Sequence, residues 1–560
     1  MHGLGEILRY INTIRYLKPI QIWHQLLKRL SGRRKAKIFS QVRKLHAKQV
    51  IPVKILIPAL DFDEVYLSRF QVEGLLKNEI EILHETHLID LTKWEVPEAS
   101  HLWNYNLQYL EFLIPLAAVC GDTQTDQYFM KWSEYIDSWI EHPAKDSFEP
   151  YTISMRIPNL LICMNMLQDK LQGTILEKRL TDSIYQQYRY LLAAQEFALL
   201  ANHYFENLKT ILICSVLFGE EKCYKKYCAK FIREIDEQIL SDGIHYERSI
   251  LYHKIILEDM LRVYAISGSE EMAGKILPVI RCMADALASV SRGFSKMPLF
   301  NDTGDNVAKD TKSLLRAVQE VTGCSIIDDR TVFEKSGYYK LYAGMYALLF
   351  DCGQIGPSYM GGHTHCDCLS FELARCGKKL FVNSGTFQYQ GGLRQFFRST
   401  RAHNTVMIDE REQSELWGEH RAARRISNVK CQVENHGVVG EFRSFYGDCF
   451  QRRMRLTDDT LAIVDCIIAN DKKKHCARHF FHINADCHFT SDDSQQVCVC
   501  NDSRKLTVIR IPDGSRWLIH REGDICSFAQ DFGELKKKEV LEIRTLFEQN
   551  VEIQIDMELL

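Results

Sequence analysis

The sequence predicts an α+β protein of more than one domain, in which a helical part precedes a part built of antiparallel strands. Its 560 residues exceed the length of one ordinary domain. Apolar residues recur at helical spacing from about residue 60 to 320, and short strand-like runs take over after about residue 330. A run of helices followed by a run of strands is typical of separate all-α and all-β domains.

The helical part is divided by short breaks. Leu107, Leu110 and Ile114 mark one apolar stripe, and Tyr188, Leu191 and Leu192 mark another. Several helices with short connections predict stacked α-hairpins, and no clean sequence repeat supports a repeat protein. The polar or glycine-containing breaks lie at 121–126, 141–150, 218–222, 241–243 and 267–271.

The strand-like part predicts a large antiparallel sandwich. About 230 residues carry strand patterns separated by polar turns such as TDDT at 457–460 and PDGS at 512–515. The expected strands lie within 338–352, 368–376, 379–385, 404–408, 429–435, 461–468, 479–483, 505–511 and 516–520.

Composition excludes several classes of protein. With 46% hydrophobic and 26% charged residues, the chain is expected to be soluble and globular, and a net charge of −3 does not indicate a nucleic-acid binder. No run of 18 apolar residues predicts a transmembrane helix, and the N-terminus lacks the features of a signal peptide. Nineteen scattered cysteines without a CxxC pair favour free thiols in a reducing cytoplasm, and the two CxC pairs, 366/368 and 498/500, are expected on strands.

The N-terminal segment is strongly basic. Residues 1–50 hold twelve Lys or Arg and one acid, Glu6, a net +11 that leaves −14 for the remaining chain. Apolar residues at helical spacing predict two basic amphipathic helices within 1–60, on either side of Pro19. These helices either dock on the main body or attach peripherally to an anionic inner leaflet. The apolar residues are Ile7, Leu8, Ile11, Ile14, Leu17, Ile22, Trp23, Leu26, Leu27 and Leu30.

The stretch GGHTHCDCLSFEL at 361–373 is the densest in potential chemistry. If it is extended, His363, His365 and Asp367 alternate onto one face. Such a set predicts either a satisfied hydrogen-bond cluster or a catalytic or metal site. Asn383 and His403 lie at the ends of apolar strands, where a sandwich could bring them close.

Two stretches of the helical part offer further candidates. ANHYFEN at 201–207 places His203 and Glu206 on one helix face, with Asn202 one position ahead. Taken alone, each stretch is more typical of core packing than of catalysis. The second, DGIHYERSILYH at 242–253, offers His245, Tyr246, Glu247, Tyr252 and His253.

Together these segments resemble the heparinase II/III family of polysaccharide lyases, which includes oligoalginate lyases and, more remotely, dermatan sulfate epimerases. The resemblance runs in family order from about residue 100 to 420. It implies an incomplete (α/α) toroid over 61–325, an antiparallel β-sandwich over 326–560, and cleavage of uronic-acid-containing polysaccharides in the cleft between them. The matching strings are WNYNLQYLEFL at 103–113, EPYTISMRIPN at 149–159, ANHYFEN, DGIHYERSILYH, MPLFNDTGDN at 297–306, and GGHTHCDCLSFEL through RSTRAHNTV at 398–406.

The resemblance also implies roles for individual residues. Asn202 corresponds to the residue that neutralises the uronate carboxylate, with His203 beside it. Tyr252 resembles the catalytic tyrosine, with Tyr246 as its nearby competitor, and His363 resembles the second acid or base. The substrate-binding candidates within the matching strings are Glu206, Tyr246, Arg156 and Arg398.

A structural zinc site is implied at His365, Asn383 and His403, where several members of the family bind the metal. The middle ligand is normally an aspartate, so the neutral Asn383 predicts weak or partial zinc occupancy. No cofactor is expected for the reaction, since the chain has no P-loop or dinucleotide-binding fingerprint.

This set of residues suits removal of the C5 proton of a uronate. The proton is a very weak acid until the adjacent carboxylate is neutralised, which an amide such as Asn202 can do. A base near C5 and an acid near O4 complete a β-elimination. Reprotonation instead of elimination would give a uronate C5-epimerase or another enzyme of surface-polysaccharide synthesis, and a glycan-binding protein without activity is the third alternative. The expected partner is therefore an acidic polysaccharide; the sequence does not predict the oligomeric state.

Overall fold

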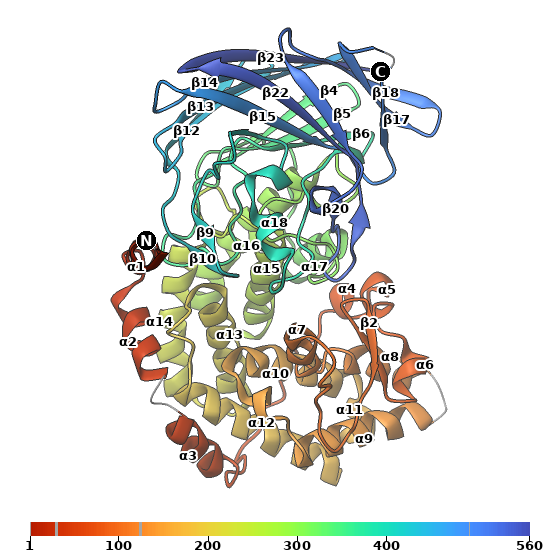
Figure 1. Cartoon of the computed structure of the whole chain (residues 1–560). Coiled ribbons are helices and arrows are strands. Elements are labelled where there is room, and N and C mark those ends of the chain that lie inside the picture. Colours follow the sequence, from red (N-terminus) through yellow and green to blue (C-terminus); the bar gives the residue numbers. More distant parts are fainter. Residues whose placement is uncertain (1, 29–31, 123–125, 492) are drawn as a thin grey trace.

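The computed structural model, which describes residues 2–28, 32–122, 126–491 and 493–560, consists of a helical body joined to a β-sheet body (Figure 1). The last long helix, α17 (Thr311–Thr322), ends just before the first strand of the second body, β3 (Val332–Phe333). The predicted order of a helical part followed by antiparallel sheets is confirmed.

The long helices form an inner and an outer layer. Helix α13 (Ala201–Leu217) buries 15 of its 17 residues, whereas the neighbouring α14 (Glu221–Gln238) buries 4 of 18, spaced as one stripe. A helix that is buried on all sides lies inside a body, and one with a single buried stripe covers it. The inner helices α8 (Leu113–Asp122), α10 (Pro150–Met166), α13 and α15 (Ile250–Ile266) pack on each other and are backed by α9 (Gln127–Glu141), α12 (Ile175–Ala193), α14 and α16 (Glu270–Ser291).

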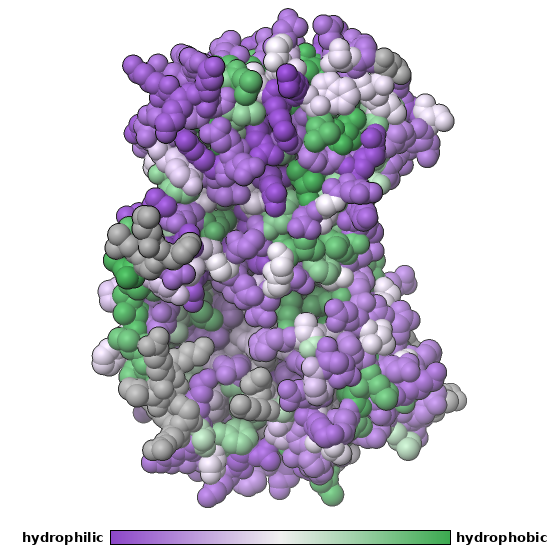
Figure 2. Space-filling model, viewed as in Figure 1, coloured by the Kyte–Doolittle hydropathy of each residue, from purple (hydrophilic) through white to green (hydrophobic). Residues whose placement is uncertain are grey.

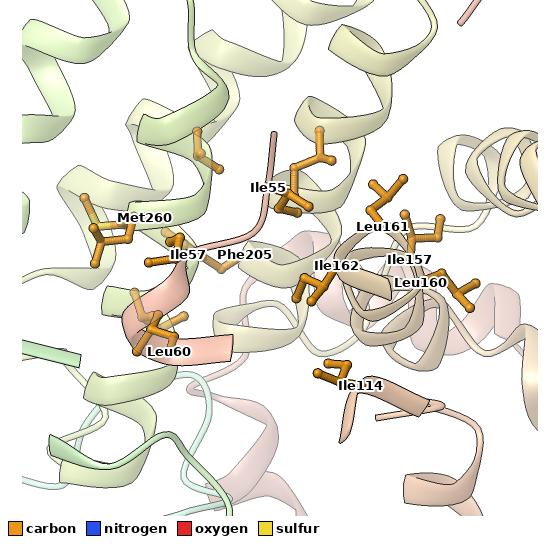
Figure 3. Close-up of a cluster of buried hydrophobic side chains, with 14 of the residues drawn as sticks. Ile55, Ile57, Leu60, Ile114, Ile157, Leu160, Leu161, Ile162, Phe205 and Met260 are labelled. Carbon is orange, nitrogen blue, oxygen red and sulfur yellow. The ribbon is translucent and has the colours of Figure 1, made fainter. Parts of the chain in front are cut away.

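A fully buried aliphatic cluster fixes these inner helices. Ile157 and Leu160 of α10, Phe205 of α13 and Met260 of α15 belong to one cluster of buried side chains, which Ile55 joins from the segment before α4 (Figure 3). Interiors of this kind are close-packed and yield little to strain. The inner helices are therefore held rigidly, and their exposed ends form a rigid surface. The shorter elements are α4 (Pro58–Asp61), α5 (Glu64–Leu67), α6 (Val72–Leu75), β1 (Glu79–Ile82), β2 (Glu85–Leu88), α7 (His101–Leu107) and α11 (Gln168–Leu171).

The basic N-terminal segment forms helices along one side of the helical body (Figure 1). They are α1 (His2–Ile14), α2 (Pro19–Lys28) and α3 (Gly32–Val42), so the expectation of two helices was incomplete. Docking through the predicted apolar stripe is contradicted, because Ile11 and Trp23 are 56% and 60% exposed. The helices contact the body through other residues, such as Tyr10 against Trp417. Arg29 and Leu30 lie outside the described residues.

The second body is built of antiparallel sheets. In β14 (Thr460–Ile468), Leu461, Ile463 and Ile467 are buried alternately with more exposed neighbours, as expected for one face against a core. The five-stranded sheet has the order β3, β4 (Tyr338–Ala343), β5 (Tyr346–Asp351), β6 (Phe371–Arg375), β7 (Lys378–Phe381). The eight-stranded sheet has the order β11 (Ser427–Glu434), β12 (Gly437–Arg443), β13 (Cys449–Leu456), β14, β23 (Asn550–Leu559), β18 (Arg504–Arg510), β17 (Gln496–Asn501), β16 (His488–Thr490). The four-stranded sheet has the order β19 (Arg516–His520), β22 (Val540–Glu548), β15 (Lys474–His482), β8 (Val406–Ile408).

The segment 361–370 is not a strand, which corrects one expectation. It is an irregular loop that enters β6 at Phe371, so its side chains do not alternate across a sheet. Cys366 and Cys368 lie in this loop, whereas Cys498 and Cys500 lie on β17 as predicted. Loop geometry sends His363 toward the helical body and His365 into the β body.

Candidate active site

A cavity of about 440 Å³ lies where the helical body meets the loops of the β body. The helices α7, α10, α13 and α15 supply one wall, and residues 360–363, 389–390 and 420 supply the other. Concave sites lined by aromatic and a few polar side chains are the usual place for ligands. Five of the predicted site residues line it: Asn202, His203, Glu206, Tyr252 and His363.

The first turn of α13 presents Asn202 and His203 to the cavity. Leu200 and Ala201 both have positive φ, 61° and 52°. Residues other than glycine rarely adopt this conformation, which costs roughly 1–3 kcal/mol for each residue. The side-chain oxygen of Asn202 accepts the backbone N–H of His203 at 3.0 Å. Its NH₂ group donates to no other described residue and is available to a ligand.

His203 is set up to carry positive charge. Its ring packs on Tyr151 with centroids 4.5 Å apart, and its Nδ1 lies 3.2 Å from Glu196 Oε1. Burial opposes the charged form, but the carboxylate of Glu196 outweighs it and raises the pKa of His203. A protonated imidazole beside the Asn202 amide favours a bound carboxylate.

Tyr252 and His363 form a stacked pair although they come from different bodies. Their ring centroids are 4.0 Å apart with planes 12° from parallel. Tyr252 lies in the first turn of α15, which Ser249 caps, and its hydroxyl lies 2.7 Å from that of Tyr389. Burial raises the pKa of Tyr252 well above its usual range, so the phenol holds its proton.

Glu247 connects this pair to Asn202. Its Oε2 lies 2.5 Å from His363 Nδ1, and its Oε1 accepts the backbone N–H of Asn202 at 3.4 Å. Burial opposes ionisation, but His363 and its hydrogen bond lower the pKa of Glu247. In the neutral tautomer of His363 in which Nδ1 donates to Glu247, Nε2 carries a free lone pair and can act as a general base.

The sequence did not single out a role for Glu247 or Tyr389. Glu247 was visible as an acid within a dense polar stretch, but its partner lies 116 residues away. Tyr389 is an aromatic residue in the polar, glycine-flanked segment TFQYQGG that follows β7, and that pattern is the one signal the sequence offered.

The deep end of the cavity holds charges that are already paired. Lys209 Nζ donates to Asp259 Oδ1 at 2.8 Å and also to Glu206, while Arg262 donates to Glu258. These partners leave Lys209 with a pKa above its usual range. Glu206 thus lines the cavity as predicted, yet one of its oxygens is committed to an ion pair.

Three predicted substrate-binding residues do not line the cavity, which corrects their assignment. Tyr246 is buried behind it, with its hydroxyl 2.7 Å from that of Tyr359. Arg156 is fully buried in the helical body, where it donates to the backbone oxygen of Gln108 at 2.6 Å. Arg398 is fully buried and donates to the backbone oxygens of Gly361 and Thr364, so it holds the loop that carries His363.

A second, closed cluster lies in the β body. One ligand atom each of His365, Asp367 and His403 lies within 4.8 Å of the others, and all three residues are buried. Asn383, the predicted middle ligand, is buried too, but its side-chain oxygen accepts from Ser370 at 2.7 Å. The carboxylate in this cluster therefore comes from Asp367, two residues after His365, and not from position 383.

Comparison with known proteins agrees with the fold. Residues 67–323 match the family described as Heparinase II/III N-terminus, and residues 328–548 match Heparinase II/III-like, C-terminal. The chain belongs to the heparinase II/III family. Its fold is that of a crystal structure of heparinase III, with a TM-score of 0.69 at 16% identity over 94% of this chain and 89% of that one. A heparan sulfate lyase from Pedobacter heparinus superposes with a TM-score of 0.56 at 15% identity, over 94% and 87%.

The curated heparin-sulfate lyases match this chain over a smaller share of their length. A heparin-sulfate lyase of Bacteroides thetaiotaomicron is 23% identical over 61% of this chain and 57% of its own length. A heparin-sulfate lyase of Pedobacter heparinus is 22% identical over 57% and 54%. This heparinase II/III family member thus spans a little over half the length of these relatives.

Proposed function

We propose that this family member is a polysaccharide lyase that cleaves a uronic-acid-containing glycan by β-elimination. The observation that carries the proposal is the double use of Glu247, which contacts both His363 and the backbone of Asn202. One buried carboxylate thereby fixes the acid–base pair relative to the residue that would face the uronate. The names of the curated relatives agree with this activity.

The geometry assigns a task to each group. The NH₂ of Asn202 and the protonated His203 bind the uronate carboxylate and stabilise the enolate that forms when C5 loses its proton. Nε2 of His363 takes that proton, because Nδ1 is committed to Glu247. Tyr252 holds its proton and gives it to O4 as the C4–O4 bond breaks, with Tyr389 as its hydrogen-bond partner.

The charges in the cavity favour a substrate of low charge density. Among the described lining residues, Glu111, Glu206, Glu258 and Asp259 face Lys209, Arg262 and Lys309, so carboxylates outnumber Lys and Arg. Lys209 and Arg262 are already paired, and burial lowers the pKa of Lys309 to about 8. A densely sulfated chain would meet few unpaired cations there. We therefore expect faster cleavage of an unsulfated chain than of its sulfated counterpart with the same backbone.

Elimination is favoured over the alternative, C5-epimerisation. An epimerase delivers a proton from the face opposite to the one that lost it, which requires acid–base groups on both sides of the sugar. Tyr252 and His363 instead stack on each other and present one side. Incubation with uronic-acid polysaccharides in deuterated water separates the outcomes. Ultraviolet absorbance of an unsaturated product supports the lyase, whereas deuterium at C5 without cleavage, or neither signal, contradicts it.

The closed cluster in the β body fits a structural zinc ion, which belongs to the same proposal. His365 Nδ1 and both ring nitrogens of His403 are buried without a hydrogen-bond partner among the described residues, an arrangement that calls for a ligand. Burial lowers the pKa of His403 well below its usual range, which keeps the imidazole neutral. Two histidines and the Asp367 carboxylate are a common zinc donor set, and the metal would tie the loop after His363 to the segment that precedes β8.

We infer the compartment and partner from other features. All nineteen cysteines are free, and a reducing cytoplasm keeps thiols in that state. Within the described residues, no helix has the length and apolar character needed to cross a bilayer. We place the enzyme in the cytoplasm, acting on an acidic glycan, with contact to the inner face of the membrane through its N-terminal helices.

A further inference from the structure

The exposed face of α1 and α2 is unusual for a protein surface. Ile7, Ile11 and Ile14 of α1 are 56%, 56% and 48% exposed, and at 3.6 residues per turn they fall within an arc of about 60°. Ile20, Trp23 and Leu26 continue the row on α2. Figure 2 shows hydrophobic side chains gathered along the edge that α1 and α2 form in Figure 1. A contiguous apolar row of this kind marks an interaction surface.

An arginine groove borders this row. It is an open groove of about 640 Å³ between α1 and the loops around β12, and Arg15, Arg424, Arg425 and Arg443 line it. Arg15 directly follows α1, and its backbone N–H donates to the oxygen of Ile11 at 3.1 Å, so the groove and the apolar row meet at the C-terminal end of α1. Of the four arginines that line the groove, Arg424 forms an ion pair with another described residue, Glu415.

Charge and chemistry select the occupant. Residues 1–50 carry a net +11, which favours an anionic partner for this surface. Guanidinium groups bind phosphates, and amphipathic rings such as those of Tyr16 and Tyr446 are enriched at bilayer interfaces. An amphipathic helix with basic flanks lies in the plane of an anionic leaflet.

We propose that α1, α2 and the arginine groove form a docking surface for an anionic phospholipid bilayer. The apolar row enters the boundary between headgroups and acyl chains, and the groove binds lipid phosphates. The surface lies outside the cavity and does not depend on the reaction, so it can fail or hold independently of the lyase assignment. It would hold the enzyme where membrane-bound glycans are exposed.

Full-length protein should co-sediment with vesicles containing phosphatidylglycerol at low salt, and binding to phosphatidylcholine vesicles should be much weaker. High salt should reduce the binding, because screening shortens the reach of the charges. Trp23 is the most exposed of the described tryptophans, so brominated lipids should quench its fluorescence and Trp23→Phe should abolish that signal. Absence of sedimentation with anionic vesicles at low salt overturns the proposal.

Variants sharpen the test. Ile11→Glu should lower the partition coefficient about ten- to hundredfold, and Arg15→Gln with Arg443→Gln about fivefold per residue. Ile175→Glu, at an isoleucine that is 80% exposed on α12, and Arg504→Gln on β18 are the matched controls and should bind as wild type. Equal binding of Ile11→Glu and Ile175→Glu contradicts the proposal. So does a dimer in lipid-free solution that Ile11→Glu dissociates, because it assigns the apolar row to a second copy.

Discussion

The open cavity and the closed cluster use the same kinds of residue in opposite ways. His363 faces the cavity, bonded to one carboxylate and stacked on Tyr252, with Nε2 available to a substrate. His365, two residues later, is fully enclosed, with Nε2 2.9 Å from Asp302. Burial lowers the pKa of His365, whose side chain is fully enclosed. The side chain of His363 keeps 12% of its surface exposed at the cavity. The difference teaches that access and partners, more than residue type, separate the histidine proposed as a base from the one proposed as a metal ligand.

The largest effect should separate the two histidines by activity. His363→Ala and Tyr252→Phe should each lower kcat about 10²- to 10⁴-fold, because each removes a proton-transfer group, while the unfolding midpoint stays near wild type. Tyr246→Phe is the control for Tyr252→Phe, since its hydroxyl bonds to Tyr359 behind the cavity. Turnover assays on a uronate polymer that the wild-type protein cleaves measure this. Near-normal kcat in both cavity variants contradicts the assignment of the active site.

A slightly smaller loss of activity is expected on replacing Asn202, the residue proposed to face the uronate carboxylate. Asn202→Ala should cost about 2.7–4 kcal/mol of transition-state stabilisation, as for other preorganised donors to developing negative charge. The loss should appear in kcat more than in KM, because the donor acts most strongly on the enolate. A change confined to KM would show that Asn202 binds the substrate without aiding the chemistry.

The closed cluster should respond in stability and metal content. His365→Ala should destabilise the fold by about 1–3 kcal/mol, since Asp302 loses a buried hydrogen bond. Zinc content after purification without added metal should be lower in His403→Ala and in Asp367→Asn than in wild type, because each variant removes one ligand of the closed cluster. Elemental analysis after dialysis against chelator measures this, and equal zinc in all three proteins contradicts the metal site.

The smallest effect should be a shift in pH dependence. Glu196 raises the pKa of His203, so the imidazolium persists to higher pH and is lost as the pH rises through that raised value. The ion pair stabilises the fold below the unfolded pKa of histidine, near 6.5, and this contribution likewise disappears as the pH rises through the folded pKa. In Glu196→Gln the alkaline limb of kcat/KM should move to lower pH. An unmoved limb would mean that His203 does not titrate in the reaction.

The sequence predicted most of the architecture because local patterns determine it. Stripes at helical spacing marked helices such as α12, and strand-like runs between polar turns marked strands such as β14. It also predicted that Asn202, His203, Tyr252 and His363 belong together, through motifs that resemble one family. All four line one cavity.

Tertiary structure decided which side chains face the cavity. Arg156 and Arg398 read as substrate-binding cations, yet both are fully buried and donate to backbone oxygens. Contacts such as Glu247 with His363 join residues more than a hundred positions apart, and no local pattern encodes that distance. The irregular loop at 361–370 likewise turned an expected alternation into two separate environments.

The N-terminal helices show the same division most plainly. The sequence by itself determined their amphipathic spacing and their net +11, because both are properties of consecutive residues. Whether the apolar row packs inward or faces solvent depends on what the rest of the fold presents to it. Here Tyr10 packs on Trp417 and Gln21 bonds to the backbone of Leu199, and these contacts fix the helices with Ile11 and Trp23 turned outward. Tertiary packing therefore decided which face of each helix is free, since burial is a property of the whole chain and spacing is not.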